Sequence, residues 1–82
     1  MTHHPLGPLS SLAQSISVGS FYEHYKGPRY KVLDIARHSE TLEELVVYLD
    51  QYGVTWVRPL AMFTENIMHQ GEMRPRFKLV AE

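Results

Sequence analysis

Polar side chains that could do chemistry stand in three short segments of this 82-residue sequence, and aromatic residues are mixed with them. An arginine presents a planar fork suited to a carboxylate or a phosphate. An aromatic ring beside it can stack on a base, a methylated amine or a peptide side chain. We therefore predict a ligand-binding site made by the following residues: His24, Tyr25, Lys26, Arg37, His38, Glu40, Trp56 and Arg58.

The first functional interpretation is a noncatalytic binding module for a small anionic ligand, a nucleic acid or a peptide. The formal net charge of −1 is too balanced for strong electrostatic steering to nucleic acid. Local patches could still hold a phosphate backbone, and the basic residues Lys26, Arg29 and Lys31 flank one turn. In a purely structural alternative, Glu40 and Glu43 pair with Arg37, Arg58 or Arg76 and only pin the connector.

A second interpretation is a small hydrolase-type enzyme, in which His38 or His24 acts as general base beside Glu40. Histidine has the right ordinary pKa for proton transfer near neutrality. However, the sequence contains no glycine-rich phosphate loop, no serine elbow, no paired-histidine zinc motif and no cysteine. Binding is therefore favoured over catalysis, and we expect no metal and no cofactor. The adjacent His3 and His4 are expected to be solvated.

A third interpretation is a protein interaction or oligomerisation domain. Leu49, Val54, Met62 and Met68 could supply an adaptable apolar surface. A small sheet domain also exposes an edge strand, and such an edge can pair with a second copy of the chain. A homodimer is therefore a further expectation of this interpretation.

The composition changes near Gly19, because residues 1–18 contain no Asp, Glu, Lys or Arg and no Phe, Trp or Tyr. We expect residues 1–18 to be an N-terminal tail that can form one short helical turn, capped by Ser10 and placing Leu12, Ala13 and Ile16 on one side. Residues 19–82 are expected to form a small β-barrel domain.

Runs of β-branched and aromatic residues, separated by glycine, proline or polar clusters, predict strands over residues 21–25, 30–37, 44–49, 55–58 and 76–80. Apolar residues on both sides of Asp34 predict a bulge there. Pro59 is placed to begin a short helix with Leu60, Phe63 and Ile67 on one face. The pattern is typical of a mainly β fold, an SH3-like small five-stranded barrel with one short helix before the last strand. An OB-fold is the second choice.

In such a barrel, the first turn, the loop after the second strand and the end of the fourth strand can meet at one rim. That rim is the expected site. The aromatic candidates for the core are Phe21, Phe63, Phe77 and, as an alternative to its role in the site, Trp56.

Five segments, at residues 24–27, 36–41, 46–48, 56–59 and 75–77, occur here in a fixed order: HYKG, ARHSET, VVY, WVRP and PRF. Together they resemble a family of short, mostly bacterial domains known only as domain-of-unknown-function family 1653. The resemblance covers residues 19–79 and implies a compact β-rich domain. It brings no established activity, ligand or catalytic residue.

The apolar runs, such as residues 45–47, are much shorter than the roughly 18 residues of a transmembrane helix. Residues 1–18 contain no lysine or arginine and are broken by serines, unlike a secretory signal. We therefore expect a cytoplasmic protein with no membrane partner.

Overall fold

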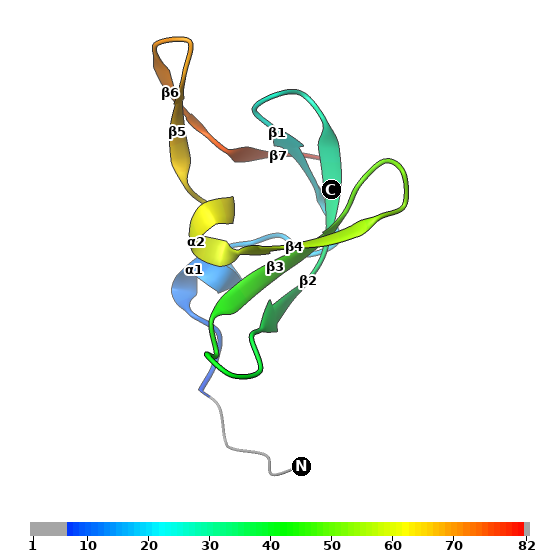
Figure 1. The fold of residues 1–82 in the computed structure, drawn as a ribbon, viewed down its shortest axis with the longest axis vertical. Coiled ribbons are helices and arrows are strands. Elements are labelled where there is room, and N and C mark those ends of the chain that lie inside the picture. The colour runs from blue at the N-terminus through cyan, green and yellow to red at the C-terminus, as the bar shows by residue number, and fades with distance from the viewer. Residues whose placement is uncertain (1–6, 82) are drawn as a thin grey trace.

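The computed structural model describes residues 7–81, which fold into a mainly β domain (Figure 1). His3 and His4 lie outside the described residues. The elements follow in the order α1 (Ser11–Gln14), β1 (Phe21–His24), β2 (Arg29–Arg37), β3 (Glu44–Leu49), β4 (Thr55–Pro59), α2 (Leu60–Phe63), β5 (Asn66–His69), β6 (Glu72–Pro75) and β7 (Phe77–Ala81).

Five strands form one antiparallel sheet in the order β4-β3-β2-β1-β7, and they correspond to the five strands predicted from the sequence. The predicted bulge is also present, because the register between β2 and β3 shifts between Val32 and Asp34. The side chain of Asp34 accepts a hydrogen bond of 2.7 Å from the backbone N–H of Ile35. This local bond stabilises the irregular backbone, and Val32 and Ile35 can therefore both face the core.

The sheet is not closed into a barrel, so the expected SH3-like five-stranded barrel is not confirmed. Within residues 7–81, β4 pairs only with β3, and β7 pairs only with β1. The chain between these two edge strands makes a separate two-stranded sheet, β5 with β6, that projects beyond the main sheet (Figure 1). Its two-residue turn places Gln70 and Gly71 at φ values of 53° and 79°, which is typical of a hairpin turn.

The helix predicted from Pro59 to beyond Phe63 is one turn long, and Ile67 lies in β5 instead. After Thr64 the helical hydrogen bonding stops, because the Glu65 backbone N–H donates to the carbonyl oxygen of Met62 at 3.3 Å instead of that of Ala61. The prediction that Ile67 shares a helix face with Phe63 is therefore wrong. A second difference is the β5–β6 hairpin, which lies between this helix and the last strand, where no strand was predicted.

The core is an aromatic cluster between the sheet, α1 and α2. Phe63 and Phe77 stack with ring centroids 4.2 Å apart, and Tyr22 meets the Phe63 ring edge-on at 5.3 Å. Such pairs stabilise the fold by about 0.5–1.5 kcal/mol each beyond the apolar area they bury. The buried hydrophobic residues are Ala13, Tyr22, Val32, Val46, Tyr48, Leu60, Phe63 and Phe77.

Two of the aromatic core candidates are exposed, Phe21 by 40% and Trp56 by 50%. Successive strand residues point to opposite faces, so Phe21 faces outward because Tyr22 occupies the core position. Trp56 pairs with Tyr48 close to the β3–β4 turn, and its indole Nε1 donates to a carboxylate oxygen of Asp50 at 2.8 Å. This bond holds the ring at the surface.

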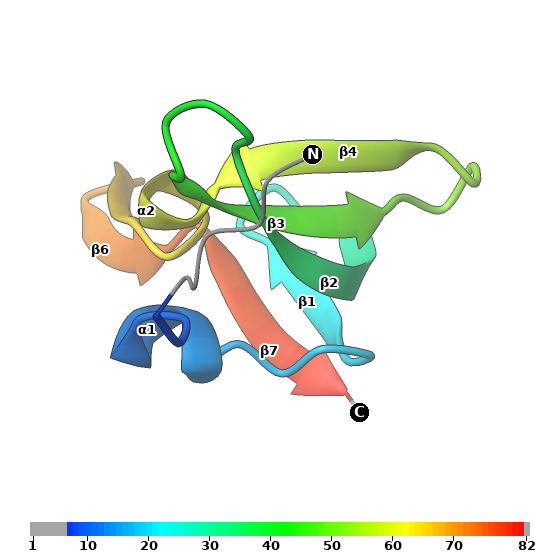
Figure 2. The same cartoon turned by 90° about the horizontal axis from the view of Figure 1, so that it is seen from below.

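The first helix packs onto the domain rather than extending from it. α1 has the predicted cap, since the Ser10 hydroxyl accepts a hydrogen bond from the backbone N–H of Ala13 at 3.1 Å. Ala13 is only 2% exposed, and α1 and α2 lie on the same side of the molecule (Figures 1 and 2). Ser10 also donates two hydrogen bonds to the Glu44 carboxylate, at 2.7 and 2.6 Å. No helix in residues 7–81 has the length and apolar character needed to span a bilayer.

Candidate functional site

The structure does not gather the predicted site residues at one rim. In the antiparallel register, Glu23 pairs with Arg29 at one end of β2, whereas Arg37 pairs with Glu44 at the other end. Consequently the β1–β2 turn and the β2–β3 connector lie at opposite ends of the sheet, and the β3–β4 turn occupies a third place (Figure 1). Four of the predicted residues come together at one of these places: His24, Tyr25, Lys26 and Arg58.

His24 and Arg58 both contact Phe77, which is the register partner of His24, and Tyr25 and Lys26 follow His24 in the chain. The His24 ring lies 4.4 Å from the Tyr25 ring and 4.9 Å, edge-on, from the Phe77 ring. The Arg58 guanidinium lies over the Phe77 ring, 5.4 Å from its centroid. Arg58 comes from β4, so Phe77 brings a distant cation to the end of β1.

Arg76 is a member of this group that the sequence interpretation had treated only as a salt-bridge partner. Its side chain is 19% exposed and lies 3.8 Å from a Glu65 carboxylate oxygen. Its Nε is buried and has no hydrogen-bond partner in the described part of the chain. We define the His24 cluster as His24, Tyr25, Lys26, Arg58 and Arg76.

Positive charge from this cluster acts on a partly buried imidazole. Burial lowers the pKa of His24 below its ordinary value of 6.5, and the charges of Arg58, Arg76 and Lys26 lower this pKa further. His24 is therefore neutral at pH 7. Lys26 and Arg58 have no ion pair among residues 7–81, and the Lys26 ammonium lies 5.7 Å from the Tyr25 ring centroid.

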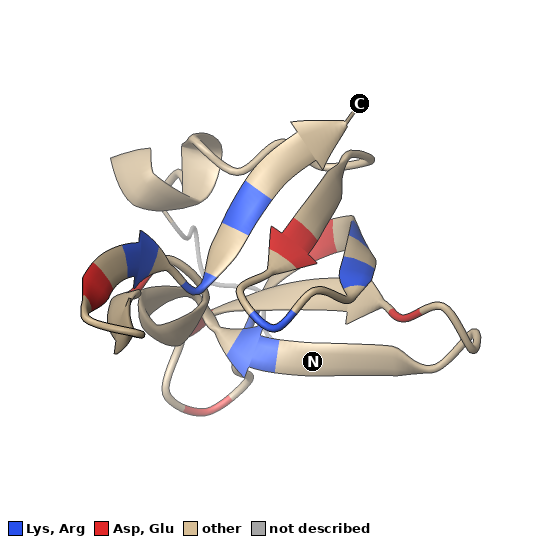
Figure 3. Cartoon of the chain, turned by 90° about the horizontal axis from the view of Figure 1, so that it is seen from above, with Lys and Arg blue, Asp and Glu red and all other residues tan. Residues whose placement is uncertain are grey.

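A cavity of about 260 Å³ adjoins this cluster and is lined by Glu23, His24, Tyr25, Arg74, Pro75 and Lys78. Figure 3 shows the basic segments of the β1–β2 turn, the end of β4, β6 and β7 gathered around this end of the sheet. The one acidic lining residue, Glu23, is 3.5 Å from Arg29. Small-molecule pockets commonly have volumes of about 300–1,000 Å³, so this cavity suits a small anionic group.

The ring surfaces of the cluster extend to the β5–β6 hairpin. His69 in β5 meets the Tyr25 ring edge-on, with centroids 5.0 Å apart. Neither His69 nor the basic residues Arg74 and Lys78 were predicted. The available signal was the close spacing of basic residues at positions 74, 76 and 78, although they belong to β6, to the link between β6 and β7, and to β7.

The other predicted site residues have local structural roles. Arg37 donates from Nη2 to the Gly7 carbonyl oxygen at 2.6 Å. The His38 Nδ1 accepts hydrogen bonds from the backbone N–H groups of Glu40, at 3.1 Å, and Thr41, at 3.3 Å. Trp56 is held by Asp50. These contacts join the N-terminal segment to β2, order the β2–β3 connector and hold Trp56 at the β3–β4 turn.

The arrangement gives little support to the hydrolase-type alternative. His38 and Glu40 are both exposed, and their contact uses the Glu40 backbone rather than its carboxylate. The His24 Nδ1 accepts from the backbone N–H of Lys26 at 3.2 Å. Across the region from Gly7 to Ala81, no group of three or more histidine or acidic residues is placed to hold a metal ion.

Comparison with known proteins identifies the family. A family model described as "Protein of unknown function (DUF1653)" matches residues 20–79. The chain belongs to the DUF1653 family. The resemblance seen in the five ordered segments is therefore confirmed, and it carries no assigned activity.

A solved DUF1653 structure has the same fold. It is the crystal structure of a DUF1653 protein from Bordetella bronchiseptica, 35% identical to this chain, with a TM-score of 0.75 over 83% of this chain and 91% of that one. No curated protein matches the chain.

Proposed function

We propose that this DUF1653 domain is a noncatalytic binding module that holds a small anionic ligand at the His24 cluster. One observation carries the proposal: side chains from the β1–β2 turn, the end of β4 and the link between β6 and β7 bring three cations near a partly buried imidazole. Like charges brought together beside a desolvated group oppose folding. A bound anion would remove this repulsion.

The donors suit a phosphate or a carboxylate. Guanidinium groups bind both anions through paired N–H donors, and the Arg76 Nε is a buried donor without an acceptor among the described residues. The tilted His24 and Tyr25 rings add a flat aromatic surface beside the cations. A ligand that joins a planar ring to a phosphate or carboxylate, as a nucleotide does, would use both features.

The proposal includes an SH3-like arrangement of the strands. The order of the five main strands, with α2 between β4 and the last strand of the sheet, supports an SH3-like arrangement whose barrel is left open. In the open form, the β5–β6 hairpin supplies His69 and Arg74 beside the cluster. This hairpin would determine which ligands fit.

A homodimer is the second candidate, and the exposed edge of β4 supports it. Trp56 and Val57 are 50% and 55% exposed, and the neighbouring Val54 is 44% exposed. An apolar edge strand of this kind is a template for pairing with an identical strand. The two candidates are compatible, because the exposed residues Val54, Trp56 and Val57 do not belong to the His24 cluster.

Nuclear magnetic resonance titration tests the proposal. Inorganic phosphate and AMP are added separately in a phosphate-free buffer at constant ionic strength, while the His24 and Tyr25 ring signals are followed. We expect saturable shifts at these two rings, with AMP binding more tightly than phosphate. Arg58→Gln should weaken binding about tenfold, as expected when one charge-assisted hydrogen bond is lost.

Arg37→Gln is the matched control, because Arg37 lies at the other end of β2 and donates to Gly7. It should leave the affinity for both ligands unchanged. Equal weakening by Arg37→Gln and Arg58→Gln, or shifts that never saturate, would overturn the assignment of the ligand to the His24 cluster. Preferred binding of an oligonucleotide or an acidic peptide over AMP would refute a small-molecule ligand.

A further inference from the structure

A second concave surface lies on the outer face of the sheet, around the end of β1 that is farther from His24. Four strands contribute one row of residues there: Ala81, Phe21, Lys31 and Leu49 are successive register partners across β7, β1, β2 and β3. Register partners point to the same face of a sheet. This row faces away from the core, because the alternate residue Tyr22 is buried.

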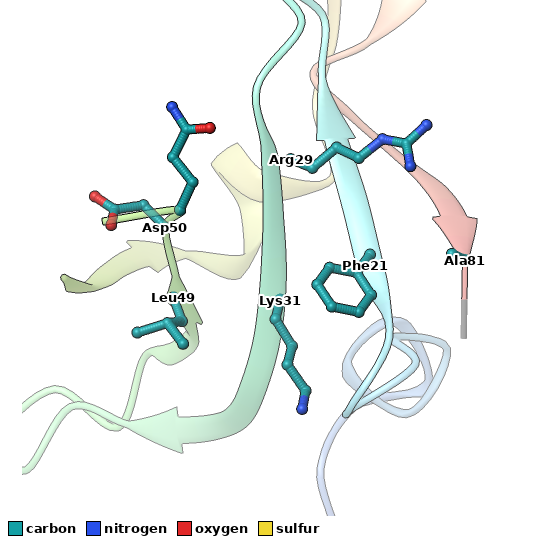
Figure 4. Close-up of a pocket in the computed structure, with 7 residues that line it drawn as sticks. Phe21, Arg29, Lys31, Leu49, Asp50 and Ala81 are labelled. Atoms are coloured by element: carbon teal, nitrogen blue, oxygen red, sulfur yellow. The ribbon is translucent and has the colours of Figure 1, made fainter. Parts of the chain in front are cut away.

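The row borders a cavity of about 510 Å³, shown in Figure 4 and lined by Phe21, Arg29, Lys31, Leu49, Asp50, Gln51 and Ala81. Phe21, Leu49 and Ala81 make it largely apolar. The Phe21 ring stands in the middle of the surface and is 40% exposed. We name this cavity the Phe21 groove.

The charges of the groove are unbalanced. Lys31 has no ion pair among residues 7–81, and Arg29 has only a 3.5 Å contact with Glu23, with 59% of its side chain exposed. By contrast, the Asp50 carboxylate already accepts hydrogen bonds from the indole of Trp56 and from the backbone N–H groups of Tyr52 and Val54. The groove therefore offers cations to an incoming ligand, while its one carboxylate is occupied.

We infer that the Phe21 groove binds an elongated aliphatic carboxylic acid. Its apolar chain would lie across Phe21, Leu49 and Ala81, and its carboxylate would face Lys31. Neighbouring strands are about 4.8 Å apart, so a row crossing four strands is about 14 Å long. This length exceeds the reach of one peptide side chain and suits an extended acyl chain. The inference does not depend on the proposed function of the His24 cluster.

Dodecanoate, kept below its micelle-forming concentration, is the probe. Isothermal titration calorimetry should show one saturable site, and nuclear magnetic resonance should place the shifts on Phe21, Leu49 and Ala81 rather than on His24. Lys31→Met should weaken dodecanoate binding about tenfold, as expected for the loss of one charged partner. The same variant should bind dodecan-1-ol as tightly as the unmodified chain does.

Lys78→Met is the matched control, since Lys78 lines the other cavity and not this groove. It should leave dodecanoate binding unchanged, and so should Arg58→Gln. Lys31→Gln repeats the test with a polar side chain in case Lys31→Met alters folding, which thermal unfolding would show. Dodecanoate that binds both Lys31 variants as tightly as it binds the unmodified chain, or that shifts only residues outside the groove, would overturn the inference. Dimerisation through the outer face that excludes dodecanoate would overturn it as well.

Discussion

Replacing Arg58 by methionine should lower stability and raise the pKa of His24 at the same time. The Arg58 guanidinium lies 5.4 Å from the Phe77 ring centroid, and its Nε donates to the Tyr48 hydroxyl at 3.3 Å. A cation above an aromatic ring contributes about 0.5–1 kcal/mol at a partly exposed site. A long hydrogen bond contributes about 0.5–1 kcal/mol. The expected loss is therefore about 1–2 kcal/mol.

This loss leaves the protein folded, because a domain of this size has a stability of roughly 4–12 kcal/mol. It should lower the melting temperature by about 4–15 °C. Removal of the positive charge should raise the pKa of His24 back toward 6.5, because the charge of Arg58 disfavours the protonated imidazole. Methionine keeps much of the volume of the arginine stem, so a packing defect contributes little.

The assay combines thermal unfolding at pH 7 in phosphate-free buffer with a nuclear magnetic resonance titration of the His24 ring. Lys78→Met is the control, because the Lys78 side chain forms no hydrogen bond or ion pair among residues 7–81 and is not among the causes of the His24 shift. An unchanged His24 pKa in Arg58→Met would refute the claim that this arginine belongs to the His24 cluster. An unchanged melting temperature would refute its contribution to the packing around Phe77.

Three further predictions concern other parts of the fold. The hydrogen bonds from Ser10 lower the pKa of the Glu44 carboxyl below 4.5. Glu44 therefore stabilises the folded protein above pH 4.5 and loses this effect as the pH falls through its folded-state pKa. Glu44→Gln should flatten the acid side of the stability curve, and equally steep acid unfolding in both proteins would disprove the link. Gly71→Ala should destabilise the β5–β6 hairpin by about 1 kcal/mol, because Gly71 has a φ of 79°; equal melting temperatures would contradict this. If β4 joins two copies, Val57→Lys should shift sedimentation toward monomer, and a homodimer that survives the substitution would exclude β4 as its interface.

Much of the sheet could be predicted from the sequence, because successive residues of a strand point to opposite faces of the sheet. The order of apolar residues in the segments that form β2 and β3 therefore indicates strands. The bulge at Asp34 was predictable for the same reason. The β5–β6 hairpin was missed because Leu60, Phe63 and Ile67 have helical spacing, whereas the helix ends after one turn and β5 begins at Asn66. Closure of the sheet depends on how two edge strands meet in space, and local sequence does not specify this.

Part of the candidate site could be predicted from the sequence, namely the part formed by neighbouring residues of the chain. His24, Tyr25 and Lys26 are consecutive, so one turn positions all of them. Arg58 joins them only because Phe77 lies between β1 and β4, which is a tertiary contact. Arg37 could not reach the same rim, since consecutive turns of an antiparallel meander lie at opposite ends of its strands.

The most direct test of the central claim is the pKa of His24, measured first in phosphate-free buffer and then at saturating phosphate, with sodium chloride added to keep the ionic strength equal. Without phosphate, the pKa should lie below 6.5. Bound phosphate should raise it, because an anion beside the imidazole favours the protonated ring. A His24 pKa that is the same in both buffers would contradict an anion site at the His24 cluster.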